Sequence, residues 1–473
     1  MRSGCILLAT ILATTIPAAA THADAGDDGV RQERLFPCPA ALEPQVRFWL
    51  AIFAEYSAHQ VVLHDALHLD KVYKVLDFRP RLDDGDSEGE VGRLARVETD
   101  LEIERIRATL LRLHGLGPHP ESLTAEEQEV YDLFKDDPSP DRFLDAADPK
   151  RLHCQRGLRE RFAEAIRVSR RYLPEMERIF RDQGLPVELT RLPLIESCFN
   201  LHAYSKVGAA GIWQFMPATG RLFMRVDNLV DGRRDPIAST RAAARFLDQM
   251  HDQLDAWPLT ITAYNHGPEG VARAVRQMGT SDIATIVQEY RGSTFGFASR
   301  NFYAEFLAAL EVERDYRRYF GDLPLDAPLH TREHRLEHAV GLETAARLAH
   351  TATDDLAGLN PALSSLVTGG RRPIPAGYRL RVPDSGAAGF EDRLAEVVAE
   401  AHVTRVAAPV PSRRGGGQPA SLTHRVRPGQ TLSHIAKQHR VTVARLRSTN
   451  RIGRAERLRP GQVLKVPVPQ AAM

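Results

Sequence analysis

The residues best suited to chemistry lie between positions 184 and 220, in the stretch GLPVELTRLPLIESCFNLHAYSKVGAAGIWQFMPATG. Within it, Glu196 directly follows the apolar Ile195, near the expected end of a helix that stops before Cys198. Apolar neighbours disfavour a carboxylate and raise the pKa of a carboxyl group. A general acid that works at neutral pH needs such a raised pKa. The sequence therefore predicts Glu196 as an acid/base residue, although a Glu on a helix is usually only a solvated side chain.

The residues that follow Glu196 are typical of a sugar site. Gly208-Ala209-Ala210-Gly211 is a run of small residues that lets the backbone approach a ligand closely. Trp213-Gln214-Phe215 then offers a flat apolar surface beside an amide, as a sugar ring would use. A tight helix crossing packed by aromatic rings is the structural alternative for the same cluster.

The elements that must position these residues are mostly helices. Residues 155–320 show dense helical spacing with Gly and Pro breaks, which predicts an all-α domain. Asp235 before Pro236 predicts a capped helix start. Residues 30–150 are predicted to be a mostly helical region, with helices near 46–59 and 95–115 and short alternating stretches at 61–64 and 72–78.

Four motifs stand in order along this part of the chain: Glu196-Ser197, then Ser205 with Gly208 to Gly220, then Arg233-Arg234-Asp235-Pro236, and then Ala263-Tyr264-Asn265-His266-Gly267. The series resembles the lytic transglycosylases of the goose-type lysozyme superfamily, and within them the membrane-bound lytic murein transglycosylase D group. The resemblance implies a lysozyme-like helical catalytic domain over residues 155–320.

This resemblance implies cleavage, without water, of the β-1,4 bond between N-acetylmuramic acid and N-acetylglucosamine in peptidoglycan. Glu196 would protonate the leaving oxygen and then accept the proton of the C6 hydroxyl that closes a 1,6-anhydro ring. One carboxyl would serve both steps, unlike the pair used by most glycosidases. The resemblance also implies that Tyr264 hydrogen-bonds near Glu196 or the N-acetyl group, that Asn265 supports the same wall, and that Ser205 and Gln214 contact sugar. It implies no metal and no organic cofactor.

The C-terminal part is predicted to be a separate module. Residues 402–422 include a Pro, Gly and Ser-rich stretch typical of a linker. Residues 423–468 resemble a LysM domain, a small βααβ fold that binds glycans containing N-acetylglucosamine. The resemblance implies glycan-binding residues at Gly429, Gln430, Thr431, Leu432, Asn450 and Ile452, although such a module can also be only a spacer. Residues 335–385 repeat this plan faintly and are a degenerate LysM-like candidate. The expected fold class is thus mainly α, with small α+β modules at the C-terminus.

Composition gives the expected setting. Residues 1–25 combine an apolar run with a small-residue tail, which predicts a secretory signal peptide and export to the periplasm or cell envelope; a buried N-terminal helix is the alternative. Of 62 basic and 61 acidic residues, 14 basic and one acidic follow residue 400, so the tail is a basic module. Cys38 and Cys154 could form a disulfide, or all three mature cysteines, Cys198 included, could be unpaired. No Cys/His spacing predicts a metal site.

The predicted partners are peptidoglycan glycan strands. The basic tail lacks any reader motif for nucleic acid, which export also disfavours. Peripheral contact with a membrane and the oligomeric state stay open. Two other functions fit the same residues: a wall-binding scaffold without catalysis, and a lysozyme-type hydrolase that uses water in place of the C6 hydroxyl.

Overall fold

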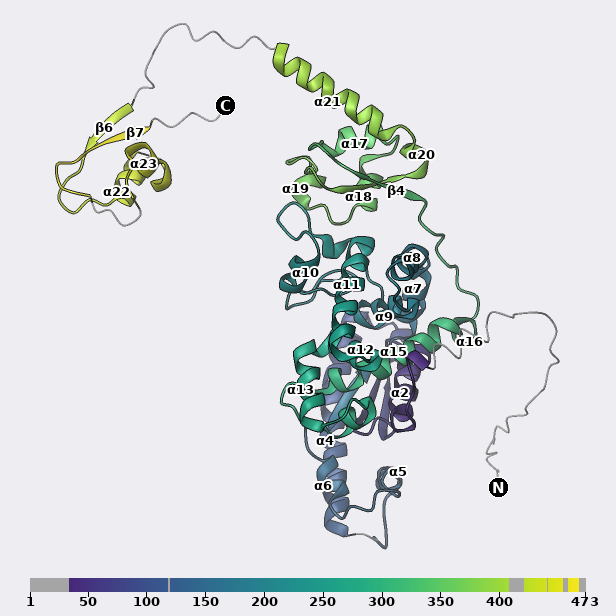
Figure 1. The fold of residues 1–473 in the computed structure, drawn as a ribbon. Helices are drawn as coiled ribbons and strands as arrows, with labels where there is room; N and C mark the ends of the chain where they lie inside the picture. Colours follow the sequence, from purple (N-terminus) through teal and green to yellow (C-terminus); the bar gives the residue numbers. More distant parts are fainter. Residues whose placement is uncertain (1–33, 118–119, 408–420, 440, 454–457, 468–473) are drawn as a thin grey trace. The chain divides into compact units, whose positions relative to one another are not determined.

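The computed structural model describes residues 34–117, 120–407, 421–439, 441–453 and 458–467 of the chain (Figure 1). The predicted signal peptide, residues 1–25, lies outside these ranges. The described residues fall into two compact units, one ending at Leu394 and the other beginning at Ala395. None of the described helices combines the length and the apolar character needed to cross a membrane.

The N-terminal region contains a three-stranded antiparallel sheet as well as helices. β1 (Gln60–Asp65) lies between β2 (Val72–Asp77) and β3 (Leu152–Arg156). The third strand was not part of the mostly helical prediction, because its partner lies far away in the sequence and local spacing does not reveal such pairing. The helices here are η1 (Ala40–Leu42), α2 (Glu43–Ala54), α3 (Arg79–Asp83), α4 (Glu88–Leu116), α5 (Ala125–Asp132) and α6 (Arg142–Ala146).

The central body is helical, as the spacing predicts. Its helices are α7 (Arg159–Ser169), α8 (Leu173–Asp182), η2 (Val187–Arg191), α9 (Leu192–Ser197), α10 (Pro217–Phe223), η3 (Gly232–Arg234), α11 (Pro236–Leu254), α12 (Trp257–His266), α13 (Pro268–Met278), α14 (Ile283–Glu289), α15 (Phe297–Arg314) and α16 (Tyr316–Phe320). Proline stands at the first or second position of α8 to α13. Proline suits that position because the N–H it lacks would have no partner within the helix.

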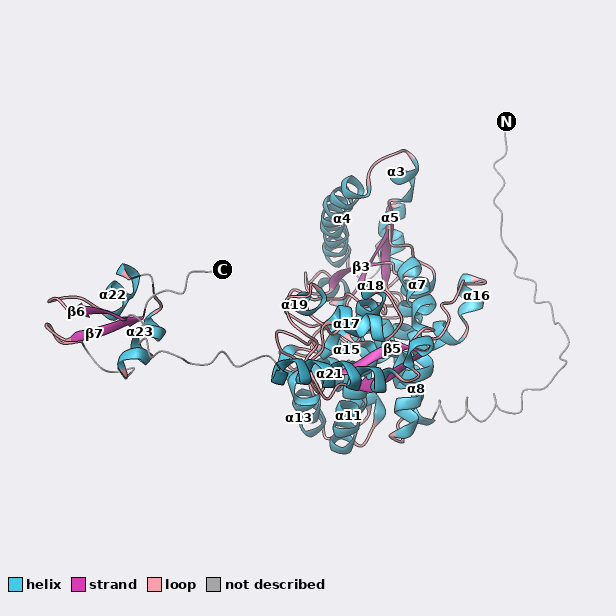
Figure 2. Cartoon of the chain, turned by 90° about the horizontal axis from the view of Figure 1, so that it is seen from above, coloured by secondary structure: helices cyan, strands magenta, loops and turns pink. Residues whose placement is uncertain are grey.

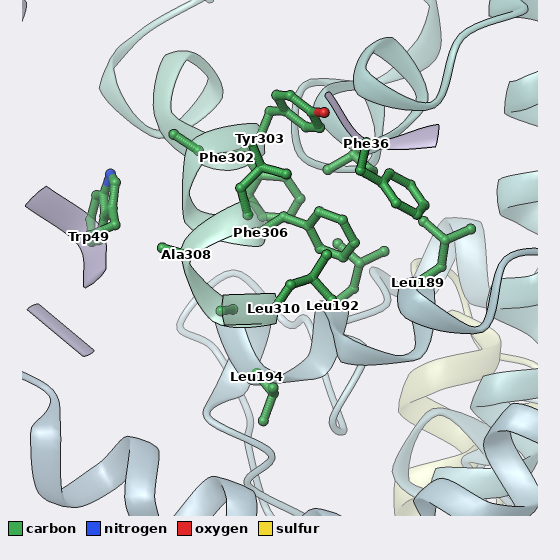
Figure 3. Close-up of a cluster of buried hydrophobic side chains, with 14 of the residues drawn as sticks. Phe36, Trp49, Leu189, Leu192, Leu194, Phe302, Tyr303, Phe306, Ala308 and Leu310 are labelled. Atoms are coloured by element: carbon green, nitrogen blue, oxygen red, sulfur yellow. The ribbon is translucent and has the colours of Figure 1, made fainter. Parts of the chain in front are cut away.

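The core of this body forms around α15. Its buried face packs against α2 from the N-terminal region and against α9. Figure 3 shows Leu192 of α9 beside Leu310 and Phe306 of α15. This packing fixes the helix that carries Glu196 against the buried face of α15.

A small α+β module follows the helical body. β4 (Thr331–Arg335) and β5 (Arg379–Pro383) pair antiparallel, with α17 (Leu342–Leu348), α18 (Thr353–Leu359) and α19 (Ser365–Thr368) between them. Its strands are short and are outnumbered by its helices, and helices also outnumber strands over the described residues as a whole (Figure 2). After α20 (Asp384–Ala387), α21 (Phe390–Ala407) includes residues 402–407, which the composition had assigned to the linker. Residues 408–420 lie outside the described ranges.

The C-terminal unit contains a second module with a similar order of elements, in which two described helices stand between the strands in place of three. β6 (Ser421–Arg425) pairs antiparallel with β7 (Val463–Pro467), and α22 (Leu432–Gln438) and α23 (Val443–Asn450) lie between them in sequence. Val426, Ile435, Leu446, Leu464 and Val466 form its core. The described chain is therefore mainly α, with two small α+β modules toward its C-terminus, of which the second has the βααβ order.

Candidate active site

Glu196 lies in the last turn of the short helix α9. The helix ends because Cys198 and Phe199 both adopt positive φ, and the Phe199 N–H then bonds to the Pro193 carbonyl at 3.0 Å. The Ser197 hydroxyl donates to the Ile212 carbonyl at 3.0 Å. The turn that carries Glu196 is thereby tied to the Gly-rich segment that follows it in sequence.

The Glu196 carboxyl is half-buried and has no hydrogen-bond or ion-pair partner in the described part of the chain. Burial raises its pKa from 4.5 to about 8, because a carboxylate loses hydration there without gaining a compensating partner. The predicted direction of the shift is confirmed. At neutral pH the group is mostly a protonated acid, which is the form that can protonate a leaving group.

Two other side chains lie within electrostatic reach of Glu196. Tyr264 of α12 donates its hydroxyl to the Trp213 carbonyl at 2.8 Å. Burial and the charge of Glu196 raise the pKa of Tyr264 well above its usual value. Glu305 of α15 is also half-buried, and burial together with the charge of Glu196 raises its pKa to about 8. The site thus holds two carboxyls and one phenol.

Glu305 was not among the residues singled out in the sequence. The signal was present but weak: Glu305 sits among Phe302, Phe306 and Ala309, on a part of α15 that is otherwise apolar and buried. Burying an ionised carboxyl costs free energy unless it is paired, so an acidic residue inside an apolar helical face indicates a function or a partner. Only the packing of α15 against α9 reveals that Glu196 is its neighbour.

Replacing Glu305 by Gln is expected to stabilise the protein at neutral and alkaline pH. The unfolded carboxyl ionises near its usual pKa of 4.5, whereas the folded protein keeps the proton to about pH 8. Between these values unfolding releases a proton, so the free energy of unfolding falls as the pH rises. Gln removes this loss, and the variant should gain about 1 kcal/mol per pH unit over the wild type between pH 5 and 8, with no gain below pH 4.5.

Urea unfolding at pH 4, 6 and 8 measures this gain. Glu289→Gln is the matched control, because Glu289 is an exposed carboxyl at the end of α14, and it should gain nothing. A Glu305→Gln difference that stays constant across the three pH values would show that the buried carboxyl does not hold its proton.

The 205–215 loop, Ser205 to Phe215, is held closed by its own polar side chains. The Ser205 hydroxyl accepts from the Ala209 N–H at 2.9 Å, and the Gln214 amide donates to the Gly211 carbonyl at 2.7 Å. Gln214 itself adopts a positive φ of 48°. The predicted sugar-contact residues Ser205 and Gln214 therefore both lie on this loop, beside α9. Both are half-buried, and each uses part of its hydrogen-bonding capacity within the loop.

The flat apolar surface predicted for Trp213 and Phe215 does not exist, because both rings are buried in the core. The Trp213 indole stacks on Phe180 and donates to the Thr240 hydroxyl at 2.9 Å. The structural alternative is right that the aromatic rings pack in the core, but the residues 205–215 form a loop and not a helix crossing. The exposed apolar side chains near the loop are instead Tyr204, Val207, Met216 and Leu222.

Asn265 lies beside Tyr264 at the end of α12 and is exposed. Its side-chain oxygen accepts from the Ser299 hydroxyl at 3.1 Å, and His266 contacts the same hydroxyl at 3.1 Å. The end of α12 is thereby linked to the start of α15. Next to α9, a hollow of about 740 Å³ is lined by Ser197 to His202 and by residues of α7. The residues after Glu196 therefore border open space.

The residues predicted to bind glycan in the C-terminal module mostly support its two loops. Gln430 accepts from the Arg427 N–H at 2.9 Å, and Thr431 caps α22. Leu432 and Ile452 are buried in the module core. The Asn450 amide donates to the Leu446 and Lys465 carbonyls at 2.8 and 2.7 Å. Gly429, with φ of 79°, forms the turn before them.

Cys38, Cys154 and Cys198 are all unpaired, so of the two possibilities left open by the sequence the structure has three free thiols and no Cys38–Cys154 disulfide. The C-terminal module carries a basic surface, whose described and exposed cations are Arg425, Arg427, Lys437, Arg445, Arg451, Arg459 and Lys465.

Comparison with known proteins gives matches to two domain families and to several relatives. Residues 177–287 match the transglycosylase SLT domain, and residues 424–467 match the LysM domain. Membrane-bound lytic murein transglycosylase D of Escherichia coli is 30% identical over 293 residues, which cover 60% of this chain and 61% of that protein. A protein of Alteromonas sp., named for tributyltin chloride resistance, is 44% identical over 108 residues, covering 22% of this chain and 52% of its own length.

Among solved structures, an inactive mutant of the lytic transglycosylase Slt from Pseudomonas aeruginosa matches 43% of this chain and 30% of its own, with 20% identity and a TM-score of 0.28. The chain spans about three fifths of the length of the E. coli relative. The SLT match contains Glu196, the 205–215 loop and Tyr264, which are the residues the structure brings together. The chain is thus similar to a lytic murein transglycosylase over about three fifths of its length, and it matches an SLT domain in its central body and a LysM domain toward its C-terminus.

Proposed function

We propose that this protein is an exported peptidoglycan lytic transglycosylase with Glu196 as its acid/base residue. The observation that carries the proposal is a half-buried carboxyl with a pKa of about 8, free of hydrogen bonds and ion pairs in the described part of the chain and beside Tyr264. Such a group is protonated at neutral pH and becomes a strong base once it has given up its proton.

In the proposed reaction Glu196 donates its proton to the bridging oxygen as the bond from C1 of N-acetylmuramic acid breaks, and N-acetylglucosamine leaves with that proton. The substrate's own N-acetyl group stabilises the cation at C1. The Glu196 carboxylate then accepts the proton of the C6 hydroxyl, whose oxygen bonds to C1 and closes the 1,6-anhydro ring. Glu196 ends protonated, so no water and no cofactor is consumed.

The second carboxyl favours this chemistry over hydrolysis. A glycosidase of the two-carboxylate type needs an ionised carboxylate as nucleophile or as the base that activates water. Burial and the neighbouring Glu196 keep Glu305 mostly protonated at neutral pH. Glu305 is therefore poorly suited to activate water, while a single carboxyl suffices for the transglycosylase steps.

The remaining parts fit this role. Ser205 and Gln214 on the 205–215 loop and Asn265 at the end of α12 contact the sugars, and the exposed Tyr204 and Met216 are further candidates for apolar sugar contacts. The C-terminal LysM module holds the enzyme on glycan strands through the surface of the loops at 429–432 and 450–453. The predicted signal peptide delivers the protein to the cell envelope.

Mass spectrometry of the products released from purified peptidoglycan tests the proposal. Muropeptides with 1,6-anhydromuramic acid ends, released by the wild type and absent with Glu196→Gln, are the expected result. Products with reducing ends would instead identify a lysozyme-type hydrolase. Binding to peptidoglycan without release of any product would identify a scaffold, and either result would overturn the proposal.

A further inference from the structure

The module at 331–383 repeats the internal architecture of the C-terminal module. In both, an Asn at the end of the second helix bridges that helix and the last strand. The Asn360 amide donates to the Leu356 and Arg381 carbonyls at 2.9 and 2.8 Å, and its oxygen accepts from the Arg381 N–H at 2.9 Å. Asn450 makes the same three bonds to Leu446 and Lys465. Arg381 and Lys465 therefore occupy equivalent positions.

The two modules differ in what their equivalent loops contact. In the C-terminal module the loop after Asn450 is one of the two predicted to bind glycan. In the 331–383 module the loop after Asn360 docks on the helical body. The Asp231 N–H bonds to the Ala362 carbonyl at 2.8 Å, and the Ser364 N–H bonds to the Leu229 carbonyl at 2.9 Å. Ala362 and Leu363 are buried by this contact, so the loop has little surface left for a glycan.

An ion-pair network also joins the 331–383 module to the helical body. The Arg381 guanidinium, almost completely buried, pairs with Asp235 at 3.2 Å and with Glu333 at 3.0 Å. Glu333 also pairs with Arg241 of α11 at 3.0 Å. Asp235 simultaneously caps α11 through the N–H groups of its first turn at 2.9 Å. Charge-assisted bonds of buried Arg to carboxylate are among the stronger polar contacts in proteins.

The docked segment leads directly to the 205–215 loop. Asp231 pairs with the buried Arg233, whose guanidinium donates to the Gly208 and Phe215 carbonyls at 2.8 and 3.1 Å. Gly211 packs so closely on the Arg233 backbone that a Cβ there would lie 1.8 Å from the Arg233 carbonyl oxygen. The segment 229–235 is thus held by the module on one side and holds the 205–215 loop on the other.

We infer that the 331–383 module braces the 205–215 loop, with Arg381 as the positioning residue of the brace, and that it does not bind the wall. The sugar-binding role of the loop rests on the proposed function, whereas the mechanical link does not. The 331–383 module would then position the active-site loop. The C-terminal module, which has the exposed Lys465 at the position equivalent to Arg381, would attach the protein to the wall.

Arg381→Met in the full chain tests the brace, with Lys465→Met as the matched control at the equivalent position. Hydrogen exchange of peptides covering residues 205–215 should speed up at least tenfold in Arg381→Met and stay unchanged in Lys465→Met. Product release from peptidoglycan should fall about tenfold, mainly in kcat, and the fraction that sediments with insoluble peptidoglycan should stay at the wild-type value. Arg381→Lys keeps the charge, so its exchange rate at residues 205–215 and its product release should both lie between those of Arg381→Met and the wild type.

Lower sedimentation of Arg381→Met with unchanged exchange and unchanged release would overturn the inference and make the module a wall binder. If Arg381→Met does not fold, as judged by circular dichroism, Arg381→Lys provides the same readouts. Absence of product release by the wild type would contradict the proposed function, yet the exchange measurement would still decide whether the brace exists.

Discussion

Glu196→Gln is expected to lower product release from peptidoglycan by about 10²–10⁴-fold, the range typical of losing a general acid/base. Gln keeps the shape of the side chain but can neither donate nor accept the proton. Wild-type activity should also fall as the pH rises through about 8, because the acid form of Glu196 disappears there.

The same variant should be more stable than the wild type. The folded-state pKa of Glu196 lies above its unfolded value, so the wild type loses stability as the pH rises from about 5 to 8. Glu196→Gln has no such carboxyl to ionise on unfolding, so it should melt at a higher temperature than the wild type at pH 7.5 but not at pH 4. Activity that survives in Glu196→Gln would show that Glu196 is not the acid. A Glu196→Gln variant that melts at a lower temperature than the wild type at pH 7.5 would show that the carboxyl is not desolvated as described above.

Gly211→Ala is expected to have the largest effect on the 205–215 loop. Gly211 has a φ of +74°, and an added Cβ would lie 1.8 Å from the Arg233 carbonyl oxygen, which is backbone and cannot swing away. The loop or the 229–235 segment would have to move. We expect a loss of roughly 3 to 5 kcal/mol in the free energy of unfolding, in the range of severe core substitutions, together with loss of product release.

Gly208→Ala is the control for Gly211→Ala, because it introduces the backbone strain of a positive φ without the clash against the Arg233 carbonyl oxygen. Gly208 also has a positive φ, of +92°, but the nearest atom to its added Cβ would be the Pro217 Cγ at an ordinary 3.7 Å. Its cost should stay near 1 to 2 kcal/mol, the strain of a non-Gly residue at positive φ. Urea unfolding and product release of the two variants measure the difference. Equal losses would mean that the contact of Gly211 with Arg233 does not position the loop.

Local sequence signals were sufficient for several features. Asp235 before Pro236 predicts a capped helix start, and Asp235 does cap α11. The helical spacing of residues 155–320 and the short alternating stretches 61–64 and 72–78 correspond to observed helices and to β1 and β2. These features depend on contacts within one turn or one strand, so neighbouring residues carry the information. The apolar residue before Glu196 likewise predicts the direction of its pKa shift.

Features that depend on contacts between distant segments were decided only by the tertiary structure. Burial of Trp213 follows from Phe180 and Thr240, which approach from other helices. Glu305 becomes part of the site because α15 packs on α9, and Arg381 becomes a link to it because a repeated module docks on Asp235. The sequence by itself singled out Glu196 as the candidate acid, together with the 205–215 loop and the helical character of the body that carries them. The second carboxyl, the buried aromatic rings and the brace required the folded chain, because each depends on residues from different elements that only packing brings together.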